Sequence, residues 1–119
     1  MIRIATVGTS VITDAFIGAA SRTPGIEVAA VSSRDGAKAR SYADRLGVAG
    51  AFAGLDAVLA DPGIDAVYIG SPNSAHAPQV AAAIAAGKHV LVEKPAVASA
   101  AEWDDLVDRA RRAGGVLIE

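Results

Sequence analysis

Short runs of apolar residues alternate along the chain with segments in which apolar residues recur at helical spacing. The runs have the length and near-continuous apolar character of buried β-strands, and turn residues bound them. They lie at Ile2–Val7, Ile26–Val31, Ala51–Phe52, Ile64–Ile69, His89–Val92 and Val116–Ile118. Strands that alternate with helices in this way predict βαβ units and a parallel sheet.

Capping and breaking residues divide the segments between these runs into helices. Asp35 can cap a helix that Gly47 ends, and Ser99 with Glu102 matches a capping box. Further helices are expected at about Ile12–Arg22 and Ala75–Ala86, with a one- or two-turn helix before Asp61. Right-handed crossovers place helices on both faces, so the expected fold is a doubly wound α/β sheet of about six strands.

Composition limits the classes of function that remain. A chain of 119 residues, 52% of them hydrophobic, fits one domain, and no second domain is expected within residues 1–119. The absence of cysteine excludes disulfides and thiolate metal sites, and with two histidines no metal site is expected. A net charge of −2 gives no electrostatic footprint for nucleic acid.

Membrane and export signals are weak. The longest wholly apolar stretch is Val80–Ala86, far short of the about 20 residues that span a bilayer. Polar residues such as Thr9, Ser10 and Asp14 interrupt the N-terminal apolar region, which therefore does not match a signal peptide. The expected location is the cytoplasm.

The turn after the first strand could hold a phosphate group. It consists of Gly8, Thr9, Ser10, Val11 and Ile12, and it precedes a helix whose N-terminal amides attract anions. The dinucleotide fingerprint at this place is G-x-G-x-x-G/A, of which only Gly8 is kept. From this loop alone, dinucleotide binding and an ordinary βα turn both remain open.

The second strand is followed by Ser33 and Arg34. Enzymes that use NAD usually place an acidic residue here for the ribose hydroxyls, whereas a guanidinium suits the 2′-phosphate of NADP. Arg34 therefore favours NADP over NAD, and a solvated surface role remains the alternative.

Two further segments follow strands at the same expected edge of the sheet. The first runs from Ser71 and Pro72 through Asn73 to His76, and the second is Glu93-Lys94-Pro95. Taken singly, Asn73 is a turn residue, His76 a first-turn histidine with a solvent-facing default, and Glu93 with Lys94 a surface pair.

Taken together, these motifs resemble the N-terminal NAD(P)-binding domain of the Gfo/Idh/MocA oxidoreductases. The resemblance rests on the Gly8-Thr9-Ser10 turn, on the P-N-x-x-H pattern that begins at Pro72, and on the G-K-H-V-x-x-E-K-P pattern from Gly87 to Pro95. It runs from Ile2 to Glu119. It implies a Rossmann-type fold and an NAD(P)-dependent oxidoreductase that acts on a sugar, cyclitol or related hydroxy compound.

The resemblance also implies roles for single residues. Lys94 is the expected catalytic residue, beside the nicotinamide and the substrate oxygen, and Glu93 and Pro95 are expected to form the loop around it. Asn73 and His76 are expected to shape the pyrophosphate and nicotinamide-ribose region, with Ser71 and Pro72 setting their loop. The expected cofactor-binding set is Gly8, Thr9, Ser10, Val11, Ile12, Ser33, Arg34, Ser71, Pro72, Asn73, His76, Glu93, Lys94 and Pro95.

The family also carries a second, substrate-binding domain, and no segment of these 119 residues corresponds to it. We therefore expect a fragment or truncated form that is incomplete for catalysis alone, with NADP preferred and NAD as the alternative. The rival hypotheses are a stand-alone NAD(P)-binding or redox-sensing module and a purely structural domain. The sequence leaves the substrate and the oligomeric state open.

Overall fold

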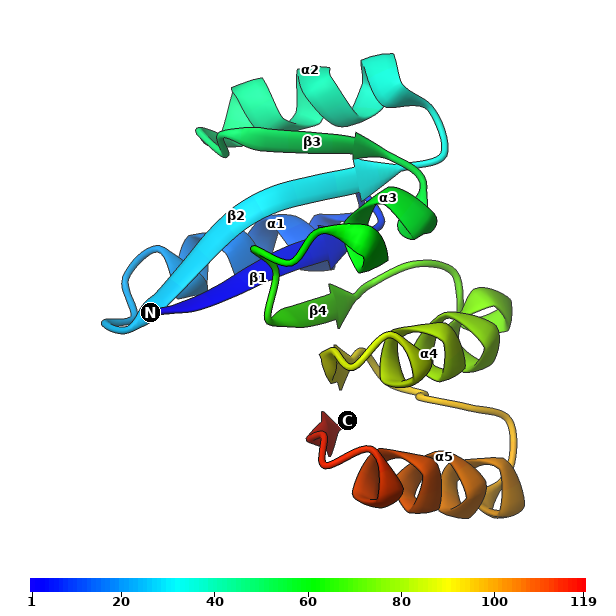
Figure 1. The fold of residues 1–119 in the computed structure, drawn as a ribbon. Helices are drawn as coiled ribbons and strands as arrows, with labels where there is room; N and C mark the ends of the chain where they lie inside the picture. Colours follow the sequence, from blue (N-terminus) through cyan, green and yellow to red (C-terminus); the bar gives the residue numbers. More distant parts are fainter.

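The computed structural model describes residues 1–119 as a six-stranded parallel sheet with helices on both faces (Figure 1). The strand order is β3-β2-β1-β4-β5-β6. The strands are β1 (Ile2–Val7), β2 (Ile26–Ser33), β3 (Gly50–Ala53), β4 (Ala66–Ile69), β5 (His89–Val92) and β6 (Leu117–Ile118). This order turns back between β1 and β4, which is the switch point of a doubly wound sheet. The expected fold class is confirmed.

Five α-helices and one 3₁₀ turn connect the strands. They are α1 (Val11–Ala20), α2 (Gly36–Leu46), α3 (Leu55–Ala60), the 3₁₀ turn η1 (Asn73–Ala75), α4 (His76–Ala85) and α5 (Ala100–Arg112). The side chain of Asp35 accepts hydrogen bonds from the amides of Ala37 and Lys38, as the sequence predicts. The Ser99 hydroxyl likewise accepts from the Glu102 amide at 3.2 Å.

Some element boundaries differ from the prediction for local reasons. The β4 strand begins at Ala66 instead of Ile64, because Asp65 is held against β1 by main-chain and side-chain bonds to Arg3. The helix predicted from Ala75 begins at His76, after a 3₁₀ turn in which the Ala75 amide donates to the Pro72 carbonyl. In both places the backbone amides still find partners, since the Asp65 amide donates to the Arg3 carbonyl and the Ala75 amide to the Pro72 carbonyl.

The two faces of the sheet bury unequal cores. The face under α3, α4 and α5 carries a cluster of 16 buried residues that includes Val7, Ile69 and Val92. The face under α1 and α2 carries a cluster of only five, centred on Val31 and Ile17. The smaller cluster covers β2 and its surroundings and leaves the α1 side of β4 and β5 thinly covered.

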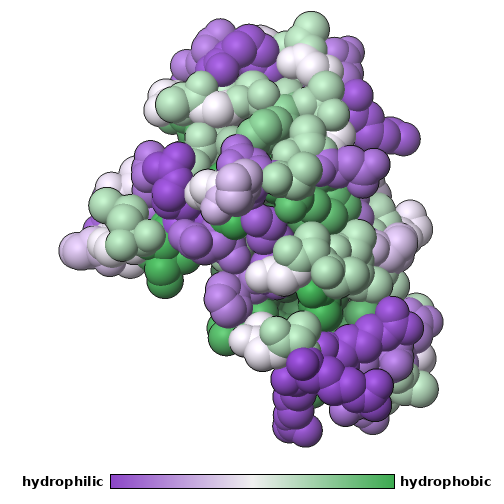
Figure 2. All heavy atoms as spheres, in the orientation of Figure 1, coloured by the Kyte–Doolittle hydropathy of each residue, from purple (hydrophilic) through white to green (hydrophobic).

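Helix α5 has one apolar side and one charged side. Leu106 and Ala110 are buried, whereas Asp–Arg pairs four residues apart lie on its exposed surface. The charged side forms the strongly hydrophilic region at the bottom of the space-filling view (Figure 2). No helix of the structure is both long enough and apolar enough to cross a membrane.

Helices α1 and α2 are tied together by a polar cluster. The Tyr42 hydroxyl donates to the Asp14 carboxylate, and the Arg45 guanidinium pairs with the same carboxylate at 3.1 Å. The hydrogen bond from Tyr42, followed by Arg45, holds the pKa of Asp14 below its ordinary value, against an opposing effect of burial. Burial and the Asp14 contact raise the pKa of Tyr42, which keeps its hydroxyl a donor.

Asp14→Asn is expected to flatten the acid dependence of stability. A carboxyl group whose pKa is lowered by folding stabilises the folded state above its ordinary pKa, and that contribution is lost as the pH falls through the lowered value. Thermal melting followed by circular dichroism should therefore show a smaller loss of Tm below about pH 4 in the variant than in the wild type. Asp104→Asn, at an exposed aspartate outside the five ion pairs, is the control. An unchanged acid dependence in Asp14→Asn would contradict this role.

Candidate dinucleotide site

The loops that follow β1, β2, β4 and β5 lie next to one another at the carboxyl edge of the sheet. Main-chain hydrogen bonds between neighbouring strands continue into the first residues of these loops. The Gly8 amide donates to the Ser32 carbonyl, the Gly70 amide to the Val7 carbonyl, and the Glu93 amide to the Ile69 carbonyl. These bonds join the loops after β2, β1, β4 and β5 in the order of their strands. The four loops from which the predicted site residues come therefore lie along one edge, at the switch point where open α/β sheets bind ligands.

Gly8 allows the two central loops to touch. Its φ is +101°, and a Cβ atom built there would lie 2.9 Å from the carbonyl carbon and oxygen of Gly70. Only glycine combines that backbone conformation with so close an approach. Gly8 is the one glycine of the dinucleotide fingerprint that this sequence keeps. The contact between the β1–α1 and β4–α4 loops requires glycine at this position.

The N-terminus of α1 opens directly onto this contact. No side chain caps it, although Ser10 is the N-cap residue, and Val11 and Ile12 are exposed. The first amides of a helix have no partner within it, so this end can donate hydrogen bonds to an anion. The Ser10 hydroxyl donates to the Gly70 carbonyl at 3.2 Å, which adds a second tie between the two loops.

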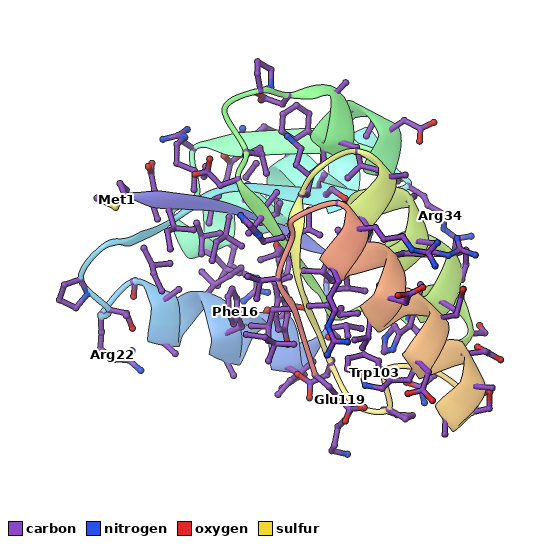
Figure 3. All side chains as sticks on the ribbon, turned by 60° about the horizontal axis from the view of Figure 1, so that its bottom comes forward. Met1, Phe16, Arg22, Arg34, Trp103 and Glu119 are labelled. Atoms are coloured by element: carbon purple, nitrogen blue, oxygen red, sulfur yellow. The ribbon has the colours of Figure 1, made fainter.

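Arg34 lies at the outer end of the same edge. It follows β2 and precedes the Asp35 cap of α2, and its side chain is exposed and free of ion pairs and hydrogen bonds within the chain. Figure 3 shows Arg34 and Arg22 at opposite ends of the molecule. Arg34 is therefore available to an anionic group at the loop edge, and Arg22 is not.

The loop after β4 divides into an exposed part and a buried part. Pro72 and Asn73 are exposed, whereas the Ser71 hydroxyl donates to the side-chain oxygen of Gln79 at 2.5 Å. His76 is only 1% exposed, so the solvent-facing default for this residue taken singly is wrong. The first turn of α4 packs against the neighbouring loop, and the ring is enclosed between them.

The loop after β5 is held by side chains from its neighbours. The Tyr68 hydroxyl donates to the Glu93 carboxylate at 2.9 Å, and the Ala96 amide donates to the Glu119 carboxylate at 2.8 Å. The peptide bond between Lys94 and Pro95 is cis. Burial, followed by the bond to Glu93, raises the pKa of Tyr68, so its hydroxyl remains protonated.

Lys94 faces a pocket on the thinly covered side of the sheet. The pocket has a volume of about 560 Å³, and Phe16 stacks on Tyr68 along one wall with ring centroids 4.0 Å apart. Its lining residues are Ile12, Phe16, Tyr68, Leu91, Val92, Glu93, Lys94 and Glu119. Lys94 is exposed and takes part in none of the five ion pairs, so its ammonium group is free to meet a ligand.

Sequence reasoning did not find every residue that shapes this site. Tyr68 and Phe16 lie in a strand and a helix whose apolar pattern marks them only as core. Glu119 stands 23 residues from Ala96, and only the β5–β6 pairing brings its carboxylate to that amide. The position of Tyr68 one residue before the end of β4 was the available signal, because strand ends reach the ligand edge.

The edge has the parts that a dinucleotide needs. The exposed N-terminus of α1 suits a diphosphate, the Gly8 turn lets a ligand approach the backbone, and Arg34 and Lys94 lie at the outer ends of the row of loops. The fold and this edge define a Rossmann dinucleotide-binding domain.

Comparison with known proteins identifies the family. The model of the Gfo/Idh/MocA group, described as an oxidoreductase family with an NAD-binding Rossmann fold, matches residues 2–119. The chain belongs to this family and is its NAD-binding Rossmann domain, which confirms the resemblance seen in the sequence.

Relatives extend well beyond the matched region. The chain is 46% identical over 110 residues to D-xylose 1-dehydrogenase (NADP(+)) 2 of Haloferax volcanii, which covers 88% of the chain and 34% of that protein. It is 39% identical over its whole length to scyllo-inositol 2-dehydrogenase (NADP(+)) of Bacillus subtilis, of which it covers 36%. The chain thus spans about a third of the length of these relatives.

Solved structures agree on the fold. A 3-ketoreductase from Actinomadura kijaniata, in complex with NADP, superposes with a TM-score of 0.92 at 33% identity. The superposition covers 98% of this chain and 37% of that one.

Gly8→Ala is expected to disrupt the contact between the two central loops. Alanine at this position is strained by the positive φ, which alone costs about 1–2 kcal/mol. Its methyl group also clashes with the Gly70 main chain, so the loss of folding free energy should be larger than that. Gly25→Ala is the matched control, because Gly25 has φ +84° with nothing within 4 Å of the added atom. Urea unfolding of both variants measures the difference. Equal losses would show that the loops do not need this close approach.

Proposed function

We propose that this chain binds NADP within an oxidoreductase that transfers a hydride between the nicotinamide and a sugar, cyclitol or related hydroxy compound. The observation that carries the proposal is the single row of loops, with a free guanidinium at one end and a free ammonium group beside the pocket at the other. The named activities of the relatives support it, since they are dehydrogenases of D-xylose and of scyllo-inositol that use NADP(+).

The proposed preference for NADP rests on Arg34. Its guanidinium is unpaired within the chain and follows β2 directly, the place where a ribose phosphate of a bound dinucleotide is read. No carboxylate takes the place of a ribose-binding acid, because Asp35 is engaged with the first amides of α2. A planar guanidinium can hold a phosphate with two parallel hydrogen bonds.

The proposed chemical role belongs to Lys94. Bound nicotinamide supplies the hydride acceptor or donor. An ammonium group beside the pocket can donate a hydrogen bond to the reacting oxygen of the substrate, where negative charge grows as a carbonyl is reduced. Glu93 forms no ion pair with this ammonium group, and its carboxylate accepts a hydrogen bond from Tyr68. Substrate contacts and exclusion of water fall to the part of the relatives that extends beyond this domain.

Titration with NADPH and NADH tests the binding step directly. Quenching of Trp103 fluorescence or calorimetry should show binding of NADPH, and more weakly of NADH. Absence of binding of either at about millimolar concentration, where the binding free energy is near −4 kcal/mol, would contradict the proposal and favour a purely structural domain.

Arg34→Asp is expected to weaken NADPH binding by about tenfold to a hundredfold and NADH binding by much less, because a charged hydrogen bond to the 2′-phosphate is replaced by like-charge repulsion. Arg22→Asp makes the same charge change at the far end of the molecule and serves as the control (Figure 3). An equal loss for both cofactors would show that Arg34 does not discriminate between them.

Lys94→Ala is expected to leave NADPH affinity within about threefold, and to lower turnover by about a hundredfold or more, as general acid–base groups do. Turnover is measured after joining this domain to the remaining segment of a relative such as the scyllo-inositol dehydrogenase, with the unsubstituted fusion as the active reference. Turnover equal to that reference would remove Lys94 from the reaction, and binding with an inactive reference would favour a non-catalytic binding or sensing module.

A further inference from the structure

His76 joins two loops of the site through both nitrogens of its ring. Nδ1 lies 2.8 Å from the main-chain oxygen of Pro95, and Nε2 lies 2.8 Å from the main-chain oxygen of Ser71. The side chain is almost fully buried, so water does not compete for either nitrogen. The ring therefore links the loop after β4 to the loop that carries Lys94.

Both partners of the ring are acceptors. A carbonyl oxygen cannot donate, so each short contact requires an N–H on the imidazole side. A neutral imidazole has only one N–H. The lone pair on its other nitrogen would then face the lone pairs of a carbonyl oxygen, which is repulsive. Only the doubly protonated ring donates to both carbonyls, and no carboxylate is a hydrogen-bond partner of the ring.

The contact with Pro95 fixes one particular peptide group. The carbonyl of Pro95 accepts from His76, and the amide of the same peptide unit, that of Ala96, donates to Glu119. A planar peptide held at both its oxygen and its nitrogen cannot rotate. On the other side of Lys94, the Glu93 amide donates to Ile69, and its side chain accepts from Tyr68. The main chain of Lys94 is thus clamped before and after the residue, and its side chain is left free.

We propose that His76 is a positioning residue, which holds the Lys94 loop by donating hydrogen bonds from both ring nitrogens at once. It acts through the main chain of Pro95, and its ring is almost fully buried. The importance of this brace for hydride transfer rests on the proposed function, whereas the brace itself can be measured without cofactor.

The chain contains an internal reference for the protonation state. Its other histidine, His89, accepts a hydrogen bond at Nδ1 from the Val116 amide at 3.0 Å, so that nitrogen carries no hydrogen. In a ¹⁵N-labelled, cofactor-free sample near neutral pH, His76 should show two protonated ring nitrogens, and His89 should show an unprotonated Nδ1. A single protonated nitrogen in His76 would overturn the proposal.

Two variants separate the two bonds. In His76→Asn the side-chain amide nitrogen is attached to Cγ, as Nδ1 is, and can still donate to Pro95. In His76→Gln the amide nitrogen lies one atom further out, as Nε2 does, and can donate only to Ser71. Hydrogen exchange at the Ala96 amide should therefore accelerate by about tenfold in His76→Gln and by less than about threefold in His76→Asn.

Exchange at Val67 in the buried sheet reports global stability in the same samples, and His89→Gln is the control at the other histidine. A merely space-filling histidine would lower the protection of Ala96 and Val67 together and to the same extent in both variants, which would overturn the proposal. Because no cofactor is present, failure of NADPH to bind contradicts only the proposed function, and the ring signals test the role of His76 independently.

Discussion

The close approach of Gly8 to the main chain of Gly70 is the contact on which the arrangement of the site depends. It lies between β1 and β4, where the sheet reverses its order, and it sets how far apart the first and second halves of the ligand edge stand. The Ser10 hydroxyl reinforces the same contact from the start of α1. The N-terminus of α1 therefore lies beside the contact between the β1–α1 and β4–α4 loops, and the main chains of Gly8 and Gly70 set the distance between these loops.

From that junction the loops are linked outward, one to the next. The bond from Ser10 joins the β1 loop to the β4 loop, His76 joins the β4 loop to the β5 loop, and Glu119 joins the β5 loop to the end of β6. Every link uses a main-chain group on at least one side. Each link therefore needs the strand order that brings its two loops together, and it needs a specific side chain on only one of the two loops.

The sequence was sufficient for the fold because each element carries its own local signal. Apolar runs marked the strands, and Asp35 and Ser99 marked helix starts that the structure confirms. The motif residues were correctly expected along one edge, since parallel strands share their carboxyl ends. The buried state of His76, the bond from Tyr68 to Glu93 and the reach of Glu119 could not be predicted, because they arise from packing between elements distant in the sequence.

The phenol of Tyr68 has a consequence for the chemistry available in the pocket. Burial, followed by its bond to the Glu93 carboxylate, raises the pKa of Tyr68, which favours the protonated phenol in this pocket. Its hydroxyl donates to the Glu93 carboxylate, which forms no ion pair with the neighbouring Lys94. Among the polar groups around the cavity, this leaves the Lys94 amine as the one whose hydrogens are not already committed to the protein.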